Sequence, residues 1–559
     1  MTMWVVSLLV WLLFAPQGVP ASPAPATDGS GTIAGVVTRL DDDKPIEGAL
    51  VQLQRINPAS SAVPASPDRV PPQSVRTNAL GAYRFDKLPA GAYTLLVTAN
   101  KFFPPDAIPT RPSGFGKRLD LTDGQHLEQV NLVLAPAGAI EGHALDEFGD
   151  PAPGVTMMVT QLMSAAGKSR LMPVGGRNVT VTDDRGAFRV FGLAPGDYYL
   201  VALSGPFGRS SVSAFSTPAD TRAGFAPTYF PGTASAVDAR PVHIGVGHDT
   251  AGVTFPLVPS PLFTVSGTVS GLAGATAGAT QIMLLELHGG DVRAIIPANT
   301  ATAPDGTFTY RNVPQGSYVV QAFSPQGFGA TTLSVTDHDV ADISVKMLPP
   351  STMRGHMSFD GTSPVPPKDA IFLAVGPTDF VTGPVGGNRP PSVKVNDDYS
   401  FELPGLQNVG VLVGNAPPGW QLLRATVDGE DITDKPYDFR SHDVSNVDVV
   451  FTDRWGSVKA TVLDVNEQPA PDCAVIVFSP DPTKWRFPTR YVRGGRANQQ
   501  GIFIAGLLPS GTYLAVAVPQ NAAPGPEYDS ALLESLRGAA TRVTLSTTGQ
   551  TALTLHLVR

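Results

Sequence analysis

A motif of fixed spacing occurs four times in this chain and constrains the fold more than any other feature. Its first copy is GAYRFDKLPAGAYTLLV, residues 81–97, and the others begin at Gly186, Gly306 and Gly501. Each glycine is followed by an aromatic residue at +2, a glycine at +10 and a tyrosine at +12. The aromatic residues are Tyr83, Phe188, Phe308 and Phe503, and the tyrosines are Tyr93, Tyr198, Tyr318 and Tyr513. Such regularity indicates a repeated structural unit.

The motif has a physical interpretation as a strand, a corner and a second strand. The first glycine provides the positive φ of a hairpin turn, and the aromatic residue shares one face with its i+2 neighbours on the following strand. Pro and Gly then end that strand. The tyrosine opens the next strand, so we expect its ring in the core and its hydroxyl on a backbone partner near the corner. The prediction is an all-β protein of antiparallel β-sandwiches.

Opening and closing strands divide the chain into five units. GTIAGVV, GAIEGHA, FTVSGTV, STMRGHM and GSVKATV open them, and alternating apolar segments close them. The predicted domains, called domains 1 to 5 below, are residues 31–136, 137–260, 261–350, 351–453 and 454–559. Their linkers are too short for large swings, so we expect a stiff, extended chain.

Domain 4 departs from the repeat. In NDDYSFELPGL we place Asp397 at the glycine position, Tyr399 at the aromatic position and Val409 at the tyrosine position. An extra hairpin with an Asp-Gly turn follows in PPGWQLLRATVDGEDITD. In domain 5, PEYDSALLESLRGAA predicts the one helix, whose leucines we expect to dock on their own sandwich.

The N-terminus indicates export. An apolar run of about thirteen residues, Met3 to Ala15, precedes the small residues of Val19-Pro20-Ala21. We therefore predict a signal peptide over residues 1–21, a linker over residues 22–30 and no membrane span in the mature chain. The alternative is an uncleaved anchor, which the absence of Lys and Arg before the apolar run favours.

The segment from Gly35 to Val51, with Pro45, Gly48 and Ala49, followed by the repeated motif, resembles the carboxypeptidase regulatory-like domain. This resemblance implies a transthyretin-like sandwich of the kind found beside metallocarboxypeptidases, in outer-membrane receptors and in surface stalks, in most cases without catalytic activity. PTYFPGT and VDGEDITD also look like segments of secreted bacterial proteins with several such domains. Starch-binding-like relatives bind sugars, so carbohydrate binding is implied at the level of the fold.

The motifs for chemistry do not point to an enzyme. No histidine lies in H-x-x-E or H-E-x-x-H and no G-x-S-x-G occurs, so we predict no catalytic residues, no bound metal and no cofactor. Cys473, the single cysteine, lies in the alternating run DCAVIVFS, which favours a buried, inert thiol. The acidic segment DGEDITD could hold calcium, but its spacing favours a solvated hairpin tip. The net charge is −9 and no basic, aromatic-interleaved face occurs, so we expect no nucleic-acid partner.

Two aromatic segments remain as candidate ligand sites. Trp485 and Tyr491 lie with several Lys and Arg in PTKWRFPTRYVRGGR, and Tyr229 and Phe230 lie in TYFPGT. Such groups can stack on a sugar or receive an acidic glycan. Alternatively, the aromatic rings cover the sandwich while the charges face water. The resulting hypothesis is an exported, non-catalytic binding or structural protein whose partner is a polysaccharide or a cell-surface protein, and the alternative is a spacer or envelope-assembly scaffold that binds proteins only.

Overall fold

The computed structural model describes residues 29–558, except 57–71, 105–115, 166–167, 175–178, 205–206, 208–222, 272–279, 290–291, 293, 295, 380, 382, 384–391, 418, 441, 487 and 520–529. The predicted signal peptide, residues 1–21, lies outside this part of the chain. Within it, no helix is both long enough and apolar enough to pass through a lipid bilayer.

The chain is all-β, as predicted. Its strands are described below by the five proposed domains, and β20 begins at Pro259, two residues before the predicted start of domain 3. Domain 1 contains β1 (Gly31–Arg39), β2 (Leu50–Ile56), β3 (Gln73–Arg76), β4 (Ala82–Leu88), β5 (Gly91–Thr98), β6 (Phe102–Phe103), β7 (Lys117–Leu121), β8 (His126–Leu127) and β9 (Leu132–Pro136). Domain 2 contains β10 (Gly138–Leu145), β11 (Thr156–Ala165), β12 (Lys168–Pro173), β13 (Val179–Val181), β14 (Ala187–Leu193), β15 (Gly196–Leu203), β16 (Ala223–Phe225), β17 (Thr228–Tyr229), β18 (Val242–Ile244) and β19 (Thr250–Pro256). Domain 3 contains β20 (Pro259–Ser270), β21 (Gln281–Leu287), β22 (Ala298–Ala301), β23 (Thr307–Pro314), β24 (Gly316–Ser324), β25 (Gly327–Val335) and β26 (Val340–Lys346).

The two C-terminal domains also contain short helices. Domain 4 contains β27 (Ser351–Asp360), η3 (Lys368–Ala370), β28 (Phe372–Pro377), β29 (Lys394–Val395), β30 (Ser400–Leu406), β31 (Val409–Ala416), β32 (Trp420–Val427), β33 (Glu430–Asp431), β34 (Tyr437–Asp438) and β35 (Val444–Thr452). Domain 5 contains β36 (Gly456–Leu463), β37 (Ala474–Phe478), η4 (Pro482–Trp485), β38 (Val492–Arg496), β39 (Ile502–Leu508), β40 (Gly511–Val518), α1 (Ser530–Leu536), η6 (Arg537–Ala539), β41 (Thr541–Leu545) and β42 (Gln550–His556).

Most domains consist of two packed sheets. In domain 5, for example, β39-β36-β42 faces β38-β37-β40-β41, and domain 1 repeats this order with β4-β1-β9 and β3-β2-β5-β7. Pairing between these strands is antiparallel, except that the opening and closing strands of each domain pair in parallel, such as β36 with β42, and that β1 also pairs in parallel with β8. In domain 4 the predicted extra hairpin, β32 and β33, joins both layers into one continuous sheet.

The repeated motif performs the predicted roles. The turn glycine adopts a positive φ, 70° at Gly81 for example, and the aromatic residue at +2 is buried in every copy. Each corner tyrosine donates its hydroxyl to the carbonyl four residues earlier, as Tyr513 does to Pro509 at 2.8 Å. These bonds satisfy a hydroxyl that would otherwise be buried without a partner.

A glycine in the opening strand has a second steric role. An added Cβ at Gly142 would overlap the carbonyl oxygen of Val253 in the closing strand, where the pairing register shifts. Gly35, Gly267 and Gly355 have equivalent positions against Val130, Ile343 and Val447. In domain 5 the closing strand pairs without a shift, and Ala460 is accommodated there. The glycine therefore accommodates the irregularity of the closing strand.

The predicted alignment of domain 4 was wrong by two residues. Phe401 pairs with Gly355 as Tyr83 pairs with Gly35, so Phe401 is the core aromatic residue. Tyr399 therefore occupies the glycine position, with φ 60°, and Val411 replaces the corner tyrosine. The error arose because a non-glycine residue takes the left-handed conformation at this turn.

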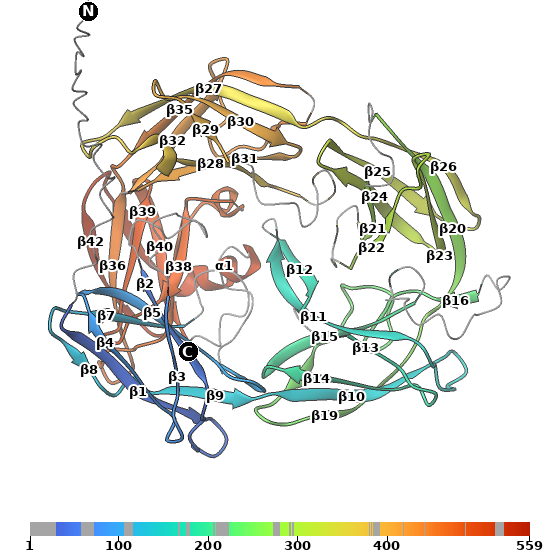
Figure 1. The fold of residues 1–559 in the computed structure, drawn as a ribbon, viewed down its shortest axis with the longest axis horizontal. Helices are drawn as coiled ribbons and strands as arrows, with labels where there is room; N and C mark the ends of the chain where they lie inside the picture. Colours follow the sequence, from blue (N-terminus) through green and yellow to red (C-terminus); the bar gives the residue numbers. More distant parts are fainter. Residues whose placement is uncertain are drawn as a thin grey trace, which may run out of the picture.

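The domains form a closed circle rather than the extended chain that we expected (Figure 1). Domains 2 and 3 share one hydrophobic cluster, which includes Leu203 and Tyr229 from domain 2 and Tyr318 from domain 3. Gln321 of domain 3 donates to the carbonyl of Gly383 in domain 4. The circle closes through hydrogen bonds between domains 1 and 5, for example from Gln499 to Asp120. Short linkers set the position of each neighbour, but they do not determine whether successive rotations bring the ends together.

Candidate functional site at the junction of domains 4 and 5

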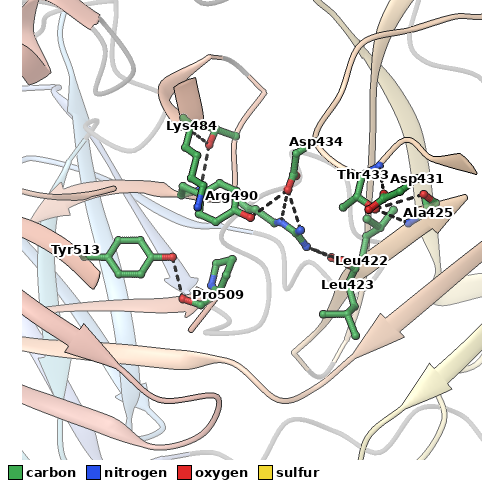
Figure 2. Close-up of polar contacts among 12 residues, drawn as sticks. Leu422, Leu423, Ala425, Asp431, Thr433, Asp434, Lys484, Arg490, Pro509 and Tyr513 are labelled. Atoms are coloured by element: carbon green, nitrogen blue, oxygen red, sulfur yellow. Dashed lines mark hydrogen bonds and ion pairs between the residues drawn. The ribbon is translucent and has the colours of Figure 1, made fainter. Parts of the chain in front are cut away.

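Arg490 of domain 5 and Asp434 of domain 4 form an ion pair across the domain boundary (Figure 2). Nε and Nη2 of Arg490 donate to Oδ2 of Asp434 at 3.0 and 2.8 Å. The hydroxyl of Tyr491 donates to the same oxygen at 3.2 Å. The Arg490 side chain is only 17% exposed, so water screens this pair less than it screens a surface ion pair. We call this group, together with the two carbonyls described next, the Arg490 clasp.

The rest of the guanidinium binds main-chain carbonyls of domain 4. Nη1 of Arg490 donates to the oxygens of Leu422 and Leu423, at 2.8 and 2.9 Å. These residues lie where β32 shifts its register against β35, between Leu422 and Arg424. A β-bulge interrupts the ladder of backbone hydrogen bonds, which leaves carbonyls available for another donor. The guanidinium, with its rigid fan of N–H groups, is suited to reach a carboxylate and two carbonyls at once.

The carboxylates of the acidic segment DGEDITD do not converge on one point. Asp428 accepts from Asn446, Asp431 accepts from the backbone N–H of Thr433, and Asp434 belongs to the clasp. The hydrogen bonds from Thr433 hold the pKa of Asp431 below its ordinary value. Among the residues that the structure describes, no group of three or more His, Cys, Asp or Glu side chains is arranged to hold a metal ion.

Trp485 lies in a hydrophobic core and offers no open face. It is 1% exposed and belongs to the cluster that α1 forms with the outer face of the β37–β40 sheet. Its Nε1 donates to the carbonyl of Ser479 at 2.6 Å, and its ring meets Phe478 edge-on at 5.7 Å. Leu533 of α1 completes this cluster, so the helix docks on its own sandwich, as expected. For Trp485 the arrangement supports the alternative in which the ring covers the sandwich.

Tyr491 is half-buried and lies beside cationic groups. The ammonium of Lys484 lies 4.7 Å from the ring centroid, and the guanidinium carbon of Arg490 lies 5.5 Å from it. Both distances are within the range of cation–π attraction. Burial raises the pKa of the Tyr491 hydroxyl. Tyr491 is therefore a part of the clasp that still presents some surface to solvent.

The other two candidate residues, Tyr229 and Phe230, lie far from the clasp in domain 2. Tyr229 is 1% exposed and belongs to the cluster that domains 2 and 3 share. Phe230 is half-buried and meets Phe255 edge-on, with ring centroids 5.9 Å apart. Tyr229 thus joins two domains, and only Phe230 presents part of its ring.

Sequence reasoning missed Arg490 and Asp434 as partners. It treated DGEDITD and PTKWRFPTRYVRGGR as separate features, because they belong to different domains and lie 56 positions apart. An available signal was the placement of both segments in insertions that the other domains lack. Charged residues in unique insertions beside a domain boundary are candidates for contacts across that boundary.

A comparison with family models identifies the first domain. Residues 32–135 match the model of the carboxypeptidase regulatory-like domain. Domain 1 is thus similar to the carboxypeptidase regulatory-like domain. This agrees with the resemblance inferred from the motifs of that segment. The search of curated proteins found no significant match.

The search of solved structures found bacterial proteins that are similar to this chain at low scores. The minor pilin GBS52 of Streptococcus agalactiae is 14% identical, and the alignment covers 44% of this chain and 100% of that one with a TM-score of 0.25. For the Bacillus anthracis TIE protein the corresponding values are 9%, 94%, 73% and 0.16. For the shaft pilin spaA of Lactobacillus rhamnosus GG they are 14%, 44%, 98% and 0.19. At these scores the similarity carries no argument about function or domain arrangement.

Proposed function

We propose that this chain is an exported, non-catalytic scaffold that holds five β-sandwich domains in fixed positions and binds a polysaccharide or a cell-surface protein. The observation that carries the proposal is the Arg490 clasp. Its charged and aromatic side chains, which could have formed a reactive or ligand-binding group, contact one another and the backbone of the neighbouring domain. Such contacts fix an angle between domains, which is what a scaffold requires.

Calorimetry tests this role. In wild type, domains 4 and 5 should unfold in one transition, because the clasp couples them. Arg490→Gln removes the charge and most of the donors, so the two carbonyls lose their shared donor and Asp434 keeps only the hydroxyl of Tyr491. The loss should be about 2 kcal/mol or more, and the transition should split or broaden. Arg486→Gln is the matched control, because Arg486 is exposed on the same loop.

The outcome decides between a clasp and an incidental contact. An unsplit transition in Arg490→Gln at the wild-type temperature would show that the contact does not couple the domains. Hydrolysis of a glycan or peptide by the purified wild-type chain would contradict the non-catalytic assignment.

Carbohydrate binding is a second candidate function, and a specific observation favours it at Tyr491. This ring keeps some exposure and has Lys484 beside it, a pairing that suits an acidic sugar. A glycan array with Tyr491→Ala and Tyr491→Phe tests the idea. Binding that is lost in the alanine variant and kept in the phenylalanine variant would assign the ring as a stacking platform, because only the first variant removes it.

A blank array with wild type would leave the protein-binding scaffold as the proposal. Phe230→Ala serves as the parallel test for the second partly exposed ring. Trp485→Ala and Tyr229→Ala are unsuitable probes, because both side chains are buried and their removal would disturb the fold.

A further inference from the structure

The contact that closes the circle lies on the free edge of a sheet in domain 1. Strand β7 is the outer strand of the sheet β3-β2-β5-β7. The side-chain carboxamide of Gln499 accepts from the backbone N–H of Asp120 at 3.2 Å and donates to the carbonyl of the same residue at 2.9 Å. A residue of an added antiparallel strand would make this pair of bonds with its main chain. The Gln499 side chain thus takes the place of a neighbouring strand.

Other side chains of domain 5 extend the same contact. Nη1 of Arg496 donates to the carbonyl of Gly116, just before β7, at 3.1 Å. Nδ2 of Asn498 donates to Oδ2 of Asp120 at 2.7 Å. Lys117 and Asp472 add an ion pair at 3.7 Å, with both side chains about a third exposed. The closing contact is therefore polar, unlike the apolar cluster that domains 2 and 3 share.

The side-chain amide of Asn498 forms hydrogen bonds through both its oxygen and its nitrogen. Its Oδ1 accepts from the backbone N–H groups of Gln500 and Ile502 and so stabilises the hairpin turn. Asp183 of domain 2 makes the equivalent turn with a carboxylate, which accepts from Arg185 and Ala187. The turn needs only an acceptor, so Asp suffices there. The N–H donor of Asn498 is needed only for the contact with Asp120.

We propose that Asn498 and Gln499 form a latch that holds the five domains in a closed circle and covers the free edge of β7, and that the circle opens at this contact. Every other neighbouring pair of domains is joined by the chain itself, whereas domains 1 and 5 are held together without a direct linker. Closure is then an intramolecular binding equilibrium, set by the strength of the latch and by the effective concentration that the other four junctions impose. Opening exposes the edge of β7, and closing protects it.

Asn498→Asp tests the latch while keeping the hydrogen bonds of the turn. The variant keeps the acceptor for the turn, as Asp183 does in domain 2. It replaces the donor with a carboxylate that repels Asp120. Small-angle X-ray scattering of the full chain, extrapolated to zero concentration, should show a compact wild type and a larger radius of gyration and maximum dimension for Asn498→Asp. Hydrogen exchange at the Asp120 amide should become roughly tenfold faster or more.

Matched variants separate the latch from general effects. Asn78 makes the equivalent turn in domain 1, where its Oδ1 accepts from Leu80 and Ala82, so Asn78→Asp applies the same change away from the contact and should leave the scattering unchanged. The double variant Asn498→Asp with Asp120→Asn exchanges the amide and the carboxylate and should restore the compact form. Gln499→Ala removes the strand-like carboxamide without altering the bonds of the turn and should also open the circle.

The proposal is overturned if wild type already scatters as an open chain, or if both Asn498→Asp and Gln499→Ala remain as compact as wild type. It is also overturned if the double variant stays open while Asn78→Asp opens the chain as well, because the effect would then come from the turn. None of these results bears on glycan binding or on the Arg490 clasp, so the outcomes can be read independently.

Discussion

The buried position of Glu286 leads us to predict that the stability of domains 2 and 3 depends on pH. It lies on β21, opposite Tyr318 of β24, and its side chain is 19% exposed. Tyr318 and Tyr229 belong to the cluster that the two domains share. Burial, followed by the charge of Glu286, raises the pKa of both hydroxyls. Burial raises the pKa of Glu286 from 4.5 to about 7. A carboxylate here is therefore desolvated.

The sign and size of the effect follow from these two values. The folded state holds the proton more tightly than the unfolded chain does, so the stabilisation is complete below about pH 4.5 and is lost as pH rises through about 7. The difference corresponds to roughly 3 kcal/mol, at about 1.4 kcal/mol per pH unit. Glu286→Gln stays neutral at every pH. It should match wild type near pH 4.5 and exceed its stability by roughly 3 kcal/mol at about pH 8.5.

Differential scanning calorimetry at both pH values measures this difference in the transition of domains 2 and 3. His288 lies 3.7 Å from Glu286 and offsets its charge only when protonated, so the alkaline measurement isolates the buried carboxylate. Glu147→Gln, at an exposed turn, is the control for removing a negative charge. Equal pH dependence in wild type and Glu286→Gln would refute the reasoning, because it would mean that the carboxylate remains hydrated.

Further substitutions test individual packing arguments. Trp485→Ala should destabilise domain 5 by about 3–5 kcal/mol, measured by calorimetry, because it empties the core beneath α1. Tyr513→Phe should lose about 1 kcal/mol in the same assay, because it removes the corner hydrogen bond to Pro509. Gly142→Ala should destabilise domain 2 by about 1–3 kcal/mol, because the added methyl group overlaps the Val253 carbonyl. Cys473 is buried, and burial raises the pKa of its thiol to about 11. It should therefore react with thiol reagents near pH 8 only after unfolding.

For each of these predictions, a different result would contradict the packing argument. Trp485→Phe should be less destabilising than Trp485→Ala, and equal losses would argue against a packing role. A fully stable Tyr513→Phe would mean that the corner bond makes no net contribution. Ala460→Gly should cause no steric conflict, so a larger loss there than in Gly142→Ala would contradict the overlap argument. Rapid labelling of Cys473 in the folded chain would place the thiol at the surface.

The repeated features of the fold could be predicted because they depend on local chemistry. A positive φ, a buried ring and a hydroxyl that needs an acceptor all impose residue types at fixed spacing, and four domains carry them. The motif of domain 4 was aligned incorrectly, because Tyr399 adopts the left-handed conformation that glycine has in the other domains. Its hydroxyl donates to the carbonyl of Pro366, and its ring meets Phe359 edge-on. Tertiary contacts thus stabilise a backbone conformation that the residue type alone does not favour.

The candidate site could be predicted only in part. The aromatic and cationic loop was identified as important, but the burial of Trp485 depends on α1, which is distant in sequence. The pairing of Arg490 with Asp434 depends on the angle between two domains, and no local periodicity encodes that angle. The closed circle was missed for the same reason, because small rotations at successive junctions decide where the last domain lies.

Departures from the repeat nevertheless coincide with the contacts between domains. The bulge at Leu423, which supplies carbonyls to Arg490, lies in the hairpin that other domains lack. The turn at Asn498 and Gln499 carries two amides where the equivalent turn of domain 2 carries two carboxylates, Asp183 and Asp184. Core positions must satisfy the same sandwich in every domain, so they stay alike, whereas a residue at a junction meets a surface that occurs once. Comparing the units within one chain therefore separates residues that build a domain from residues that join domains, and it selects Asn498, Gln499, Asp434 and Arg490 as the residues whose exchange should alter the arrangement of domains while each sandwich remains folded.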